Sequence, residues 1–96
     1  MPSFRVIVAV GRLHPGVDPT TIEPTAAAAT SELAVVEASS VDVVAGEARL
    51  TIRFTEDSAR TAFRVAEHTV ARIRTVADTG AWRLTERVGG RWFRRA

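Results

Sequence analysis

The chain has 96 residues, of which 46% are hydrophobic and 25% are charged, and it contains no cysteine. This length and mixture are typical of one globular domain, and they exclude a disordered tail, a coiled coil and a collagen-like chain. The lack of cysteine also excludes disulfides, thiolate metal sites and a cysteine nucleophile. We therefore expect residues 1–96 to form a single domain.

Charge is distributed unevenly along the chain. All 13 basic residues are arginine, and lysine, asparagine, glutamine and tyrosine are absent, which indicates a G+C-rich genome and some codon bias. Residues 1–48 carry a net charge of −4 and residues 60–96 carry +6, which leaves +2 overall. The total is a weak sign of nucleic-acid binding, and the basic C-terminal third is a stronger one.

No targeting segment is evident in the sequence. The longest apolar run near the start, Val6–Val10, is too short for a signal peptide or a membrane span. We therefore expect a soluble cytoplasmic protein that does not bind membranes. A bacterial accessory protein and a phage protein both fit this description.

The first part of the chain predicts a strand, a loop and a helix. Phe4–Val10 is rich in β-branched residues and is apolar on both sides, as a central strand would be. Gly11–Asp18 is a predicted loop because it contains His14-Pro15-Gly16, and its last residue can cap a short turn. A helix is expected to begin near Pro24 and to run through Ala26–Ala29.

The next segment predicts a β-hairpin. Leu33–Ala45 is expected to be extended, with a bend at Ser39-Ser40, and Gly46-Glu47 is the expected two-residue turn. Arg49–Thr55 alternates strictly between apolar and polar residues and is the clearest strand. This turn would pair Val43 with Leu50, Asp42 with Thr51 and Val41 with Ile52.

The last part predicts a long helix followed by two strands. Apolar residues recur at spacings of three and four over Thr55–Ala77, whose first residue can cap the helix, and Gly80 is the expected left-handed residue that ends it. A strand is expected over Trp82–Val88. The Gly89-Gly90 turn then leads into a short fifth strand over Arg91–Arg95.

The order strand, helix, strand, strand, helix, strand resembles the ferredoxin-like fold, also called the split βαβ. This α+β architecture implies a two-layer sandwich with an antiparallel sheet in the order 4-1-3-2 and with the C-terminal hairpin extending the sheet beside strand 4. The apolar alternation predicts a core of Phe4, Val6, Val8, Leu50, Ile52, Phe54, Phe63, Val70, Ile73 and Leu84.

One stretch has the spacing of a phosphate-binding loop. Gly11–Gly16 follows a predicted strand and reads G-x-x-x-x-G. Such a loop needs a lysine and a hydroxyl residue next, because these reach the phosphates and the magnesium ion. Val17 and Asp18 stand there instead, so we interpret the stretch as a plain turn.

We expect the other notable polar residues to have structural roles. The two histidines, His14 and His68, have no metal-ligand spacing, and we expect His68 to be solvated on the outer face of the long helix. Glu86 is an inward acid near the edge of the sheet, where we expect it to pair with Arg91 or Arg95. We therefore assign no catalytic, metal-binding or cofactor-binding residue, and we expect no cofactor and no enzymatic activity.

One sheet face is the candidate functional surface, because two helices in a two-layer fold cover only the other face. Its centre would be apolar and its rim rich in arginine and threonine, with Trp92 opposite Arg87 at one edge. Together with the C-terminal hairpin, the predicted interaction residues are Arg5, Ile7, Val44, Arg49, Arg53, Arg83, Arg87, Arg91, Trp92, Arg94 and Arg95.

Several hypotheses fit this face. It could be simply solvated, with Asp42 paired to Arg49 or Arg53. We favour a non-enzymatic interaction module that binds a protein partner, either a second copy or another chain, because tryptophan and arginine are enriched in interfaces. The alternatives are binding to the phosphate backbone of nucleic acid and a small-ligand-binding or oxygenase- or isomerase-like dimer. Base stacking is disfavoured, because the two central strands present no aromatic residue on this face.

Overall fold

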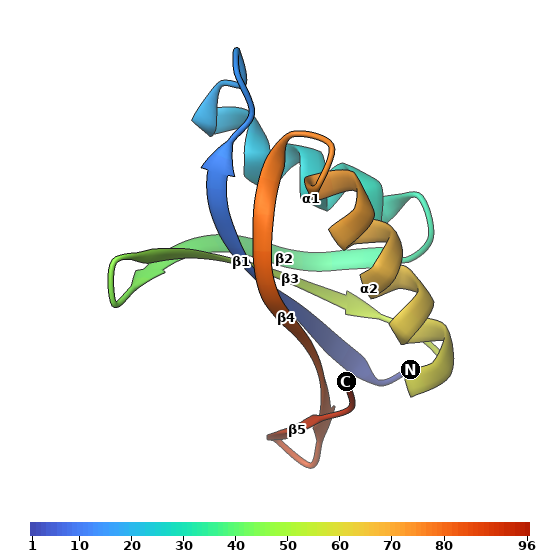
Figure 1. The fold of residues 1–96 in the computed structure, drawn as a ribbon. Helices are drawn as coiled ribbons and strands as arrows, with labels where there is room; N and C mark the ends of the chain where they lie inside the picture. Colours follow the sequence, from blue (N-terminus) through green and yellow to red (C-terminus); the bar gives the residue numbers. More distant parts are fainter.

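The computed structural model describes all of residues 1–96. Its elements are β1 (Ser3–Leu13), the 3-10 turn η1 (Pro19–Thr21), α1 (Ile22–Ser31), β2 (Val35–Val44), β3 (Glu47–Thr55), α2 (Ala59–Ile73), β4 (Ala77–Val88) and β5 (Arg91–Arg94). The strands form one antiparallel sheet in the order β2-β3-β1-β4-β5, and both helices lie on the same side of it (Figure 1). The predicted ferredoxin-like order and its C-terminal extension are confirmed.

The core lies between the helices and the inner face of the sheet. Alternate residues of β1 and β3 point inward and are fully buried, and α2 contributes a stripe at spacings of three and four. Nine of the ten predicted core residues are buried. The exception is Phe63, which is 37% exposed because it lies on the flank of this stripe, where its ring packs against Trp82 with a centroid distance of 5.7 Å.

The β2–β3 hairpin differs from its predicted register. The turn is Ala45-Gly46, with φ values of 54° and 77°, and it pairs Val43 with Ala48 and Val41 with Leu50. A two-residue turn with positive φ at both positions matches the twist of the strands, and Gly46 fills the second of them. The register shifts by two residues, so every side chain keeps its predicted face.

The predicted bend in β2 also lies elsewhere. The register shifts between Val36 and Ala38, which makes Glu37 the extra residue of a β-bulge, and Ser39-Ser40 pairs regularly with β3. The bulge brings the Glu37 carboxylate to Arg53, with Nε 3.3 Å from Oε1. The irregularity of β2 is thus a bulge that positions the Glu37 carboxylate beside Arg53.

The long helix begins later and ends earlier than the predicted Thr55–Ala77. Ser58, rather than Thr55, caps α2, because its Oγ accepts a hydrogen bond from the Thr61 backbone N–H. At the other end, the chain leaves the helix after Ile73, and β4 begins at Ala77 because β1 extends beyond its predicted end to pair with it.

Gly80 therefore lies within a strand and is not a helix cap. A Cβ atom added there would lie 3.2 Å from the Cβ of Ala9, tighter than an ordinary contact. The glycine allows β1 and β4 to approach each other at an irregular part of their ladder, between the Val8–Trp82 and Val10–Thr79 pairs.

The two helices are joined by polar contacts at their C-terminal halves. The Thr30 and Thr69 hydroxyls are fully buried and lie 2.6 Å apart. Nearby, Glu32 Oε1 lies 2.7 Å from His68 Nε2 and 2.9 Å from Arg72 Nη2. The prediction that His68 is simply solvated is thus wrong, because it bridges α2 to the end of α1.

We expect replacement of Ile52 by alanine to lower the free energy of unfolding by about 2–5 kcal/mol, because the side chain is fully buried and its loss leaves a cavity. Val43→Ala is the control, since Val43 is 73% exposed, and its effect should stay within about 0.5 kcal/mol. Urea denaturation measures both. Similar midpoints for Ile52→Ala and the wild type would contradict the core assignment.

The Glu32 bridge predicts a pH dependence of stability. The hydrogen bond from His68, and then that from Arg72, lower the pKa of the Glu32 carboxyl below its ordinary value. The stabilisation that the Glu32 carboxylate contributes is therefore fully present above the unfolded-state pKa of about 4.3. It is lost as the pH falls through the lower folded-state pKa. The stability difference between the wild type and Glu32→Gln should shrink in urea titrations taken from about pH 7 to pH 3. A constant difference would refute the assignment.

Candidate functional site

The sheet face away from the helices, called the open face below, carries most of the predicted interaction residues. Cross-strand pairing aligns Arg5 with Arg53 and Thr85, Ile7 with Thr51 and Arg83, and Arg87 with Trp92. Arg91 and Arg95 lie on the opposite side of the β4–β5 hairpin, where Arg95 pairs with Glu86 at 2.9 Å, one of the two expected partners. The arginines of the open face are Arg5, Arg49, Arg53, Arg83, Arg87 and Arg94.

The Trp92 ring lies close to the guanidinium groups of two of these arginines. The Arg5 Cζ atom lies 3.7 Å from the centroid of the Trp92 ring, and the Arg53 Cζ atom lies 5.4 Å from it. Because β4 separates β5 from β1, the contact between Trp92 and Arg5 spans β4. Trp92 is thus on the predicted face, but one side of its ring is covered by a guanidinium group of its own chain.

Few acidic groups neutralise the open face. Arg53 pairs with Glu37, which also accepts a hydrogen bond of 2.7 Å from the Ser3 hydroxyl, and Arg49 Nε lies 3.8 Å from Glu47. The predicted pairing of Asp42 with Arg49 or Arg53 is wrong, since Asp42 forms no ion pair. The arginines of this face without an ion pair are Arg5, Arg83, Arg87 and Arg94.

Arg5 is the centre of this positive charge. Its partial burial, followed by the positive charges of Arg53 and Arg87, lowers the pKa of its guanidinium. Arginine stays protonated in proteins, so Arg5, Arg53 and Arg87 all keep their positive charges. The repulsion between these charges is unfavourable in the folded protein. A nearby anion would relieve it.

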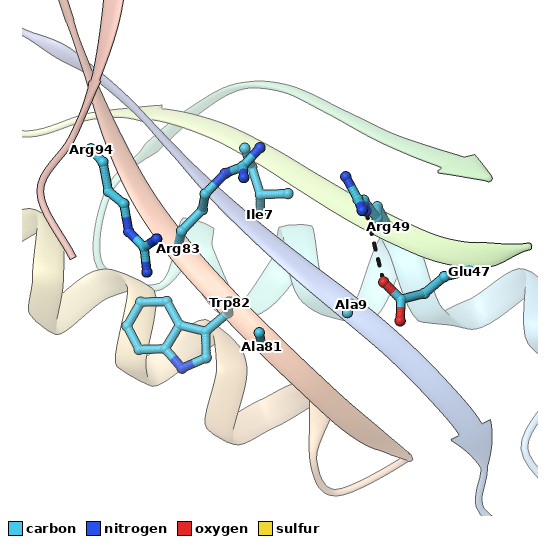
Figure 2. Close-up of a pocket in the computed structure, with 8 residues that line it drawn as sticks. All are labelled: Ile7, Ala9, Glu47, Arg49, Ala81, Trp82, Arg83 and Arg94. Carbon is cyan, nitrogen blue, oxygen red and sulfur yellow. Dashed lines mark ion pairs between the residues drawn. The ribbon is translucent and has the colours of Figure 1, made fainter. Parts of the chain in front are cut away.

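Two hollows lie on this face. The first, of about 160 Å³, has an apolar floor of Ile7, Ala9 and Ala81. Its rim includes Arg83, whose side chain points toward Ile7, and Arg94, whose side chain points toward Trp82 (Figure 2). The second, of about 380 Å³, has a more polar lining formed by Ala38, Ser39, Ser40, Thr51, Asp42, Arg5 and Arg53. The face thus offers apolar contact and arginine side by side.

The features away from the open face are a histidine contact and an apolar hollow. His14 contacts Asp78, with Nε2 3.3 Å from Oδ1, so it packs the end of β1 against β4. No three side chains of the metal-ligating types gather together, and neither helix has the length and apolar character needed to cross a bilayer. An apolar hollow of about 250 Å³ lies where Leu13, Ile22 and Val41 approach one another.

Comparisons of the chain with family models, with curated proteins and with solved structures give no match.

The stacking of Arg5 on Trp92 can be measured by a double-mutant cycle. We expect Arg5→Gln and Trp92→Leu to show a coupling energy of about 1 kcal/mol in urea denaturation, because each change removes the same cation–π contact. Arg5→Gln combined with Phe63→Leu is the control, since Phe63 lies on the helix side of the sheet. Additive effects in both pairs would contradict the stacked arrangement.

Proposed function

We propose that the protein is a non-enzymatic interaction module whose open face binds an acidic surface of a different protein. The observation that supports this most is the combination of six arginines with an apolar floor on a sheet face that no helix covers. Protein interfaces combine an apolar centre with arginine and a polar rim in this way. A cytoplasmic location, expected from the sequence, is part of this proposal.

Charge favours a different protein over a second copy. The six arginines of the open face are accompanied by only three acids, Glu37, Asp42 and Glu47, which leaves a net charge of +3. Two copies that met through this face would bring like charges together as water is excluded, which is unfavourable. An acidic partner would gain both electrostatic attraction and the apolar contacts of Ile7 and Ala9.

Nucleic acid is the alternative ligand for a basic face. Modules that read single-stranded RNA on a sheet stack bases on exposed aromatic residues of the central strands. Here β1 and β3 present Ile7, Ala9, Thr51 and Arg53, and the one tryptophan of this face is stacked with Arg5. These contacts favour a protein surface over bases.

The test compares two charge reversals of equal size. Arg83→Glu alters the open face, whereas Arg64→Glu alters an exposed residue on α2 that forms no ion pair. We expect a partner captured from the source cells to bind Arg83→Glu at least about tenfold more weakly and Arg64→Glu as strongly as the wild type. Equal capture by both variants would place the interface elsewhere.

Salt distinguishes the two ligand classes. Binding to several phosphates of a nucleic acid should fall steeply with ionic strength, while an interface with an apolar centre should weaken much less. We expect no binding of mixed-sequence RNA or DNA at about 0.15 M salt. Tight nucleic-acid binding under these conditions, lost in Arg83→Glu, would replace the protein proposal with the alternative.

A further inference from the structure

Two guanidinium groups lie close to the Trp92 ring on the open face, and a third arginine lies opposite Trp92 in the sheet. Arg5 and Arg53 lie directly opposite each other on β1 and β3, and both have their Cζ atoms within 5.4 Å of the Trp92 ring centroid. Arg87 lies directly opposite Trp92 on β4. The arginines therefore form a compact group and are not spread in a row along the sheet.

This group carries more positive charge than the chain neutralises. Like charges directly opposite each other on a sheet are destabilising, yet Arg5 and Arg53 are paired in this way. The one acid in contact with the group is Glu37, which binds Arg53 and Ser3. The lowered pKa of Arg5, caused by burial and by Arg53 and Arg87, is consistent with this crowding of charge.

A hollow adjoins the group and supplies further donors. Arg5 and Arg53 line the hollow of about 380 Å³ together with residues that include Ser40 and Thr51, whose hydroxyls can donate hydrogen bonds. Beside Arg5, the Thr85 hydroxyl is buried without a hydrogen-bond partner, outside the lining of this hollow. Guanidinium and hydroxyl donors around one hollow suit a ligand that offers several anionic oxygens.

From this arrangement we infer that Arg5, Arg53 and Arg87 bind a phosphoryl group carried by a side chain of the partner protein. This inference rests on the proposed function and names the chemistry of its ligand. A phosphorylated side chain carries a charge of about −1.5 to −2 and three acceptor oxygens, so it neutralises three clustered arginines better than a single carboxylate does. A nucleic-acid backbone, with its spaced single charges, would suit a row of arginines better.

A substitution of Asp42 tests whether the hollow binds an anion. Asp42 lines the same hollow without an arginine partner, so its negative charge opposes an incoming anion. Removal of this charge by Asp42→Asn should therefore strengthen binding, whereas most substitutions in a binding site weaken it. A gain of affinity is an outcome that general damage to the fold does not produce.

The probe is inorganic phosphate, with Trp92 fluorescence as the readout. Trp82→Phe serves as the background, because it leaves Trp92 as the only tryptophan and Trp82 does not line this hollow. At constant ionic strength, phosphate should give a saturable change that chloride does not give. Arg5→Gln and the exposed Arg87→Gln should each weaken binding by about tenfold, and Arg64→Gln should leave it unchanged.

A second arm identifies the source of the phosphoryl group. Treatment of the captured partner with a phosphatase should abolish its binding to the wild-type protein. Loss of capture together with saturable phosphate binding supports the inference. Capture that survives the phosphatase overturns it, even where free phosphate binds, because the group is then not carried by the partner. A partner that binds while phosphate and chloride act alike overturns the inference and leaves the proposed function standing.

Discussion

Two short helices can cover only one face of a five-stranded sheet, and the rest of the structure follows from this constraint. The inner face is closed by alanines and β-branched residues that let α1 and α2 approach it closely, with the Thr30–Thr69 contact fixing the helices to each other. The outer face has no covering layer of its own, so its composition is free to serve another purpose. Six of the thirteen arginines lie on that face, while apolar side chains fill the inner one.

The open face is organised by the contacts of Trp92 with two arginines. Trp92 brings the guanidinium groups of Arg5 and Arg53 to one place, although they come from strands that are not neighbours of β5. A solvated sheet face would separate like charges or alternate them with acids. The structure instead concentrates them beside a hollow, and the proposed binding role rests on this concentration of charge.

The fold could be predicted from the sequence because alternation and helical spacing report burial directly. The inward residues Leu50, Ile52 and Phe54 and the strand order follow from this periodicity. Features set by backbone geometry could not be predicted in the same way. The bulge at Glu37 depends on how β2 pairs with β3, and the extension of β4 to Ala77 depends on the length of its partner β1. No local sequence pattern records either of these pairings. The face of Trp92 was predictable from the Gly89-Gly90 turn, but its contact with Arg5 spans 87 positions of sequence and had no local signal.

The Ala45-Gly46 turn has a consequence for the dynamics of the molecule. Ala45 adopts a φ of 54°, which an alanine reaches only at an energetic cost, so the ladder rather than the turn holds the hairpin closed. The tip also projects beyond the helices (Figure 1). Val43 is 73% exposed and Val44 is 42% exposed. The strand pair should therefore fray from this end, with amide hydrogens near the tip exchanging before those of β1. Asp42, on the edge strand close to the tip, would thus be held less firmly than Arg5 on the central strand.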